Sequence, residues 1–187
     1  MLGVHHTGCC ATRAWPAYLF FVVVAGCASG ALPNGFMDTR PDDFDVLYEW
    51  REGSLPPPYH YEYQIHVAAS GSAEITLTPD YPANNVPRWT ETFTIPASQL
   101  DALYRRMLQL GLLSTAWRTD THASIGGSSE SMTVRAQGRQ IELPVFVGPV
   151  HAPRASEMYS ALRALVPDAL WDKLKMQLQE RIQKQQK

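Results

Sequence analysis

Apolar and polar residues alternate with a period of two along several short segments of this 187-residue chain. The pattern is clearest in residues 59–67, where tyrosine, isoleucine and valine alternate with histidine, glutamate and glutamine. The same alternation runs through residues 44–51, 74–78 and 89–95. Because successive side chains of a strand point to opposite faces, each segment is predicted to be a strand with one face on a core. The short turn at 69–72 predicts a hairpin between the second and third strands.

A second hairpin is predicted further along the chain. Residues 132–136 and 141–145 alternate on either side of the turn pair Gln137-Gly138. A glycine in such a turn supplies the positive φ that a tight strand connection needs.

The first helix is predicted after Pro96, where leucine, tyrosine and methionine recur at helical spacing. Ser98, followed three residues later by Asp101, is similar to a capping box with aspartate in place of glutamate. Gly111 stands where a helix C-terminus favours positive φ, so the helix is expected to end there.

Two further helices are predicted near the C-terminus. Pro153 opens the first, and Pro167 ends it because proline clashes with the preceding turn. The second starts at Asp168 and carries a leucine stripe with Trp171 beside it. This stripe could dock on another protein, but docking on the domain's own sheet is the favoured expectation. Residues 183–187 are polar all round, so this end is expected to fray.

The order ββββ-α-ββ-αα predicts an α+β domain, with an antiparallel sheet and helices packed on one face. We expect one such domain over residues 44–187, a length that can bury a core without disulfides.

The N-terminal part has a different character. An apolar run over residues 15–24 leads into Val24-Ala25-Gly26-Cys27. These four residues resemble the lipobox of bacterial lipoproteins, and the run before them is shorter than the roughly 20 residues that span a bilayer. The resemblance implies that residues 1–26 are a removed signal peptide. It also implies that Cys27 carries a diacylglycerol that anchors the protein to a membrane outside the cytoplasm.

Residues 27–43 are small, polar and interrupted by proline and glycine, which predicts a flexible tether between the lipid and the domain. Ala28 and Ser29 follow the cysteine, with no aspartate of the kind that resembles an inner-membrane retention signal in some Gram-negative bacteria. An outer-membrane location facing the periplasm is therefore the favoured expectation within the bacterial cell envelope.

Composition limits the remaining function classes. The formal charge of −2 argues against a nucleic-acid partner. Of three cysteines, Cys9 and Cys10 lie in the expected signal peptide and Cys27 would be acylated. The mature domain would then have no disulfide and no cysteine-ligated metal, and no cofactor is predicted.

One set of residues suggests metal chemistry. His60, Glu62 and His66 are predicted to share a strand face, from which they could bind zinc with a further ligand from a neighbouring strand. The plainer interpretation is an exposed polar face opposite the tyrosines of the same strand. An envelope hydrolase or metal-dependent enzyme that uses this face is therefore the alternative hypothesis.

The main hypothesis is a non-enzymatic, membrane-anchored binding or assembly module, because no set of catalytic residues is apparent. Two loops that combine proline with aromatic residues suggest a contact surface for an envelope protein or a glycan. Its candidate residues are Tyr59, His60, Tyr81 and Trp89. A small ligand held between sheet and helices is a third possibility, for which the sequence offers no identifiable polar set.

Overall fold

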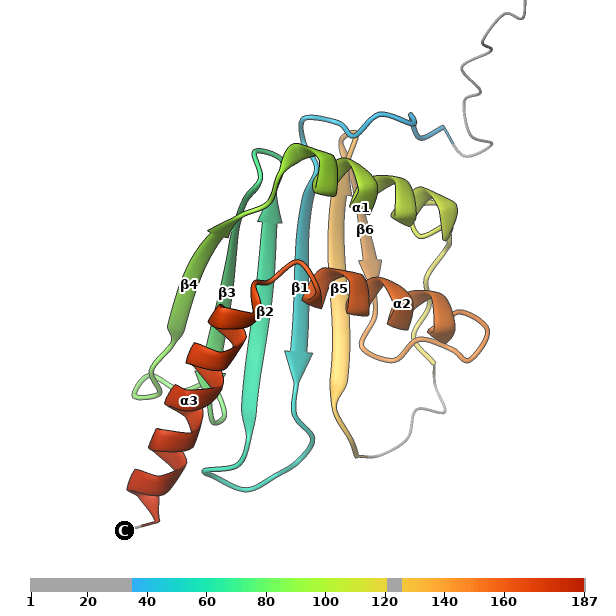
Figure 1. The fold of residues 1–187 in the computed structure, drawn as a ribbon. Coiled ribbons are helices and arrows are strands. Elements are labelled where there is room, and N and C mark those ends of the chain that lie inside the picture. Colours follow the sequence, from blue (N-terminus) through green and yellow to red (C-terminus); the bar gives the residue numbers. More distant parts are fainter. Residues whose placement is uncertain (1–34, 121–125, 187) are drawn as a thin grey trace, which may run out of the picture. The chain divides into compact units, whose positions relative to one another are not determined.

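The computed structural model describes residues 35–120 and 126–186, which form an α+β fold (Figure 1). The element order ββββ-α-ββ-αα confirms the predicted fold class. The elements are β1 (Asp45–Arg51), β2 (Tyr61–Ala68), β3 (Ser72–Pro79), β4 (Trp89–Thr94), α1 (Ala97–Gln109), β5 (Ser129–Ala136), β6 (Arg139–Leu143), α2 (Ala152–Arg163) and α3 (Asp168–Gln185). The expected signal peptide, Cys27 and the first part of the expected tether lie outside the described residues.

The described strands form one antiparallel sheet with the spatial order β4-β3-β2-β1-β5-β6. β1 pairs with both β2 and β5, so the second hairpin joins the sheet along the first strand of the chain. Trp50 on β1 is consequently opposite Tyr63 on β2 and Glu130 on β5. This register brings together residues that are far apart in the sequence.

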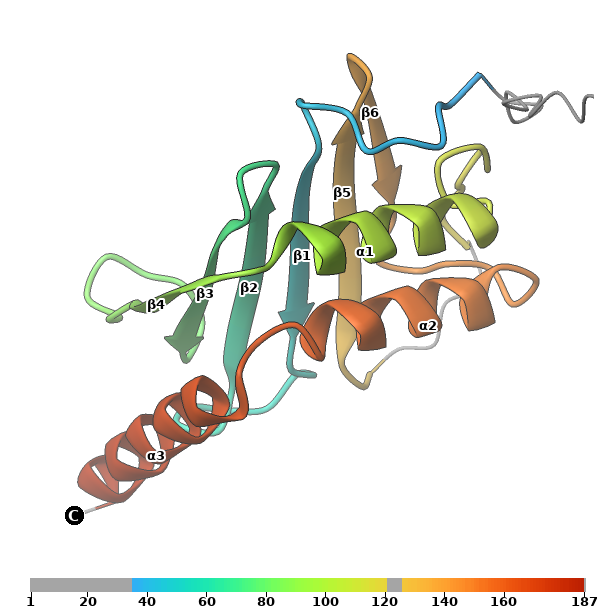
Figure 2. The ribbon, with the colours of Figure 1, turned by 45° about the horizontal axis from the view of Figure 1, so that its top comes forward.

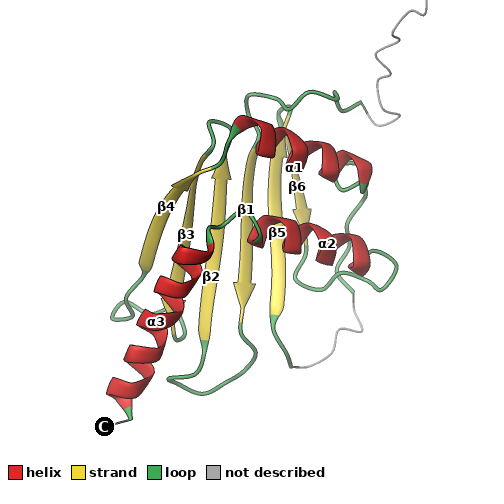
Figure 3. Cartoon of the chain, in the orientation of Figure 1, coloured by secondary structure: helices red, strands yellow, loops and turns green. Residues whose placement is uncertain are grey.

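Helices α1, α2 and α3 lie on the same face of the sheet (Figures 1 and 2). α1 and α2 run side by side across it, while α3 lies over β3 (Figure 3). Alternate strand residues such as Val46, Tyr48 and Ile65 point toward the helices and are fully buried. This alternation is expected for a sheet that helices cover on one face, because only the side chains on that face are removed from water.

Helix α1 starts two residues earlier than the capping pattern suggested. It begins at Ala97 after Pro96, and no side chain caps its N-terminus. Asp101 instead accepts a hydrogen bond from Arg40 Nε at 2.9 Å, so the expected capping box does not form. Gly111, with φ +65°, follows the helix as predicted.

Residues 36–43 pack against the domain, although they were expected to belong to a flexible tether. Phe36 is 2% exposed, and the guanidinium of Arg139 lies 4.5 Å from its ring centroid. Arg40 donates to the carbonyl of Ala69 at 2.8 Å. The carboxylate of Asp43 accepts the backbone N–H groups of the β5–β6 turn. The folded part therefore begins before residue 44.

Other boundaries also differ from expectation; α2, for example, ends at Arg163 and does not extend to Pro167. β2 begins at Tyr61, so Tyr59 and His60 belong to the preceding loop, where prolines remove the donors that a strand ladder needs. α3 extends through Gln185, although the polar sequence predicted fraying from residue 183. The side chain of Gln186 donates to the Tyr59 hydroxyl at 3.1 Å, which connects this helix end to the loop. No helix within residues 35–120 and 126–186 is both long and apolar enough to cross a membrane.

Candidate functional site

A cleft of about 590 Å³ opens on the helix-bearing side of the sheet, beside α3. It is lined by Trp50, Tyr61, Tyr63, Leu77, Ser128, Glu130, Arg163, Trp171, Lys175 and Leu178. These residues come from strands β1, β2, β3 and β5, from the loop before β5, and from the two C-terminal helices. Its volume lies within the range of about 300–1,000 Å³ that is typical of small-molecule sites.

The floor of the cleft is aromatic. Trp50 lies 4.9 Å from Tyr61 and 5.1 Å from Tyr63 between ring centroids. The sheet register creates this group, because Trp50 is opposite Tyr63 on the neighbouring strand. Tyr63 also meets Trp171 of α3 edge to face, with centroids 5.0 Å apart. The rings of three elements thus form one apolar surface, on which Trp50, Tyr61 and Trp171 remain partly exposed.

Helix α3 forms one wall of the cleft. Trp171, Lys175 and Leu178 follow each other at helical spacing and therefore lie on one side of the helix. Leu174 is fully buried and anchors α3 to the domain. An ion pair of 2.6 Å between Lys173 Nζ and Glu91 adds a second attachment.

The polar end of the cleft is a hydrogen-bonded group around Glu130. The Tyr48 hydroxyl donates to Glu130 Oε1 at 2.6 Å, and the Arg163 guanidinium donates to the same oxygen. Arg163 also donates to the Tyr48 hydroxyl at 2.6 Å. Burial, reinforced by the hydrogen bond to Glu130, raises the pKa of Tyr48 well above its ordinary value, so its hydroxyl stays protonated.

A smaller cavity of about 220 Å³ shares Ser128 and Glu130 with the cleft. Tyr159 of α2 contributes to its wall, and burial raises the pKa of this tyrosine above its ordinary value. The Tyr159 hydroxyl is buried without a hydrogen-bond partner among the described residues. Glu130 is therefore positioned between an aromatic cleft and a second, smaller cavity.

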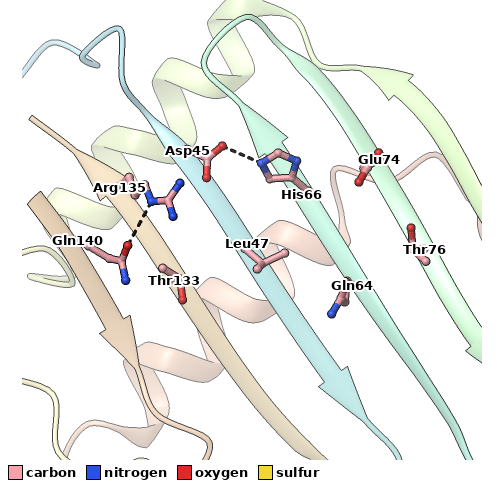
Figure 4. A pocket seen from close by; sticks show the side chains of 9 residues that line it. All are labelled: Asp45, Leu47, Gln64, His66, Glu74, Thr76, Thr133, Arg135 and Gln140. Atoms are coloured by element: carbon pink, nitrogen blue, oxygen red, sulfur yellow. Dashed lines mark hydrogen bonds and ion pairs between the residues drawn. The ribbon is translucent and has the colours of Figure 1, made fainter. Parts of the chain in front are cut away.

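The opposite face of the sheet is polar and carries a shallow hollow of about 400 Å³ (Figure 4). Its side chains come from β1, β2, β3, β5 and β6, with the helices behind the sheet in this view. Asp45 and His66 form a 2.7 Å contact, and Arg135 donates to Gln140 at 3.1 Å. The pairs are satisfied within the sheet, as expected for a solvated face.

The predicted metal set is not assembled in the structure. His60 precedes β2 and is buried, with Nδ1 3.1 Å from the Gly53 carbonyl and Nε2 3.2 Å from Glu62. His66 instead contacts Asp45. Glu62 and His66 are four residues apart on one strand, which separates them by about 13 Å. No cluster of three or more potential metal ligands occurs in the described parts of the chain, and His60, Glu62 and His66 do not form one.

The predicted aromatic surface is assembled only in part. Tyr81 stacks on His60, with ring centroids 3.7 Å apart and planes 5° from parallel. Tyr59 and Tyr81 are 48% and 44% exposed, whereas His60 is buried beneath its partner. Trp89 packs partly buried against the core, opposite Leu77 in the strand register. The four residues therefore do not form a continuous exposed surface.

The charged residues of the cleft were not identified from the sequence. Glu130 and Arg163 are 33 positions apart, and they meet only because β5 pairs with β1 beneath α2. The sequence did give a hint of the aromatic floor. Trp50 in the first strand, and Tyr61 and Tyr63 in the second, occupy the alternate positions that face the core. The chain matches no protein-family model, and a search of curated proteins finds no significant match.

Proposed function

We propose that this protein is a lipid-anchored binding module of the bacterial cell envelope, which holds a small ligand in the cleft beside α3. The anchor is supported by the resemblance of Val24-Ala25-Gly26-Cys27 to a lipobox. The binding role is supported by the described domain, and no catalytic step is assigned to it.

The observation that carries the binding role is the aromatic floor of the cleft. Trp50 and Tyr61 belong to the helix-facing side of the sheet, yet both remain partly exposed in a concave region. Covering such apolar surface contributes about 25 cal/mol per Å² removed from water. A concave, largely apolar site with a few fixed polar groups is the usual form of a small-molecule site. Here Glu130 and Arg163 supply those polar groups.

The arrangement of the strands also suits a tethered receptor. Residues 36–43 contact the sheet at its β2–β3 and β5–β6 turns, through Ala69 and Gln137. The cleft residue Trp50 lies five positions beyond Asp45 on β1, toward the other end of the strand. At about 3.3 Å per residue, that distance is roughly 17 Å. The cleft therefore lies toward the end of β1 opposite to the end that residues 36–43 contact.

Site-specific photocrosslinking in intact cells tests the binding role. A benzoylphenylalanine replaces Ser128, which lines the cleft, or Thr92, an exposed residue of β4 that serves as the control. After irradiation, the purified protein is analysed by mass spectrometry. We expect a small-molecule adduct at position 128 and none at position 92. Equal labelling at both positions, no adduct at all, or a protein adduct at position 128 would each contradict a small-ligand cleft.

The anchor has a separate test. Cells are labelled with a palmitate analogue, and the N-terminal peptide is identified by mass spectrometry. We expect a lipid-modified N-terminal Cys27, with labelling abolished in Cys27→Ser. An unmodified cysteine within an intact N-terminal segment would contradict the anchor and leave the cleft proposal standing.

A further inference from the structure

The charged groups that line the cleft are unequally compensated. Glu130 Oε1 accepts hydrogen bonds from both Arg163 and Tyr48, so the carboxylate charge is neutralised within the protein. Lys175 on the α3 wall has no ion-pair partner among the described residues. The lining therefore carries a net positive charge, located beside aromatic surface.

A cation gains little from this arrangement, since it would have to compete with Arg163 for Glu130 and approach Lys175 against repulsion. An anion would gain attraction from Lys175 and from the exposed part of Arg163. That attraction is stronger next to apolar side chains than in open water, because the local dielectric constant is lower. The net positive charge of the lining therefore favours a negatively charged ligand. The aromatic floor favours a ligand that also has an apolar part.

We propose that the cleft binds a small amphiphilic anion, with its acidic group at Lys175 and its apolar body on Trp50, Tyr61 and Trp171. This inference rests on the proposed function, since it assigns the ligand class of the same cleft. The ammonium group of Lys175 lies on the same face of α3 as Trp171 and Leu178. The acidic group and the apolar body of one ligand can therefore contact α3 together.

A pair of isosteric probes separates charge from shape. Naphthalene-1-acetate is an anion, whereas naphthalene-1-acetamide has the same ring and nearly the same shape without a charge. Binding of each probe to the mature lipidated protein in nanodiscs is measured by ligand-observed NMR, with protein-free nanodiscs subtracted. Because both probes are water-soluble, partition into the lipid stays small and is corrected by that subtraction.

Charge reversal on α3 locates the acidic group. Lys175→Glu alters the cleft, while Lys184→Glu makes the same change in charge on an exposed part of the helix away from the lining residues. We expect the acetate to bind more tightly than the acetamide. Lys175→Glu should weaken the acetate about fivefold, as for a partly exposed charge pair, and Lys184→Glu should change it less than twofold. The acetamide should respond to neither variant.

A further variant separates the two proposals. Trp171→Ala should weaken both probes, with Trp117→Phe as a control outside the cleft. If both probes bind equally and depend on Trp171 but not on Lys175, the anion assignment is wrong while the binding cleft remains supported. If neither probe depends on Trp171, the cleft itself fails as their binding site. Circular dichroism of each variant establishes that α3 is retained, so that loss of binding is not loss of structure.

Discussion

The rings of Tyr48 and Tyr159 lie 5.4 Å apart at an interplanar angle of 39°, yet only one of the two hydroxyls has a partner. Tyr48 donates to Glu130 at 2.6 Å, whereas the buried hydroxyl of Tyr159 donates to no group in the described chain. Neighbouring residues of the same type therefore have different energetic roles. The difference can be measured, because each hydroxyl can be removed without changing the ring.

Tyr48→Phe should destabilise the domain by about 1–2 kcal/mol, since it leaves Glu130 and Arg163 without their shared hydroxyl partner. Tyr159→Phe should leave stability unchanged or raise it by up to about 1 kcal/mol, because it removes an unsatisfied buried group. Urea unfolding at neutral pH compares the two variants. Equal destabilisation by both would mean that the Tyr159 hydroxyl has a partner in solution.

Stability should fall as the pH rises above about 10, the ordinary pKa of an unfolded tyrosine. Burial raises the pKa values of Tyr48, Tyr159 and Tyr63 in the folded protein. Between pH 10 and these higher folded values, the unfolded chain loses protons that the folded chain retains. Each such tyrosine then removes up to about 1.4 kcal/mol per pH unit from the free energy of unfolding.

The measurement is urea unfolding at pH 8, 10 and 11, with tyrosinate absorbance recorded in parallel. Tyr159→Phe should reduce the alkaline loss of stability because one titrating group is gone. A free energy of unfolding that is constant up to pH 11 would contradict the raised pKa values.

Asp43→Asn should loosen the β5–β6 turn. The two oxygens of Asp43 accept the N–H groups of Gln137 at 2.7 Å and Gly138 at 2.5 Å, and these bonds lower the pKa of the carboxyl. The stabilisation is present above the ordinary aspartate pKa and is lost as the pH falls through the lowered value. Hydrogen exchange at Gln137 and Gly138 should become faster in the variant. Asp42→Asn, an adjacent substitution of the same type, should leave both exchange rates unchanged.

Gly71→Ala should destabilise the domain by about 1–3 kcal/mol, because the position combines positive φ with a backbone contact. Gly71 has φ +90°, and an added Cβ would lie 2.5 Å from the carbonyl oxygen of Ile95. Gly138→Ala provides the comparison, since its φ is +68° but nothing lies within 4 Å of an added Cβ. Thermal unfolding should show the larger loss at position 71, and an equal loss would assign the effect to φ alone.

Several elements could be predicted because their causes are local. Alternation along β2 and around the β5–β6 turn indicated strands, and the proline positions indicated where helices α2 and α3 begin. The three residues of the predicted metal set do not meet, for a local reason as well. His60 is part of the loop that contains the prolines, where it stacks on Tyr81 and contacts Glu62. His66 lies four residues further along β2 and contacts Asp45 instead.

The packing of residues 36–43 could not be read from composition. Their polar, proline-containing sequence is typical of a tether, but Phe36 has a site beneath Arg139, and Arg40 reaches both Asp101 and Ala69. These partners are contributed by α1, by the first residue of β6 and by the β2–β3 turn. Their proximity depends on the arrangement of the whole sheet.

Side-chain periodicity and turn chemistry thus suffice for the fold class and the order of elements, because each acts over a few neighbouring residues. The cleft depends on interactions over much longer separations. Pairing of β1 with β5 places Trp50 opposite Glu130, while the packing of α3 adds Trp171 and Lys175. A strand of given pattern can pair with several partners at nearly equal local cost. Burial of the shared core decides which strands pair. The pairing in turn decides which residues meet in the cleft.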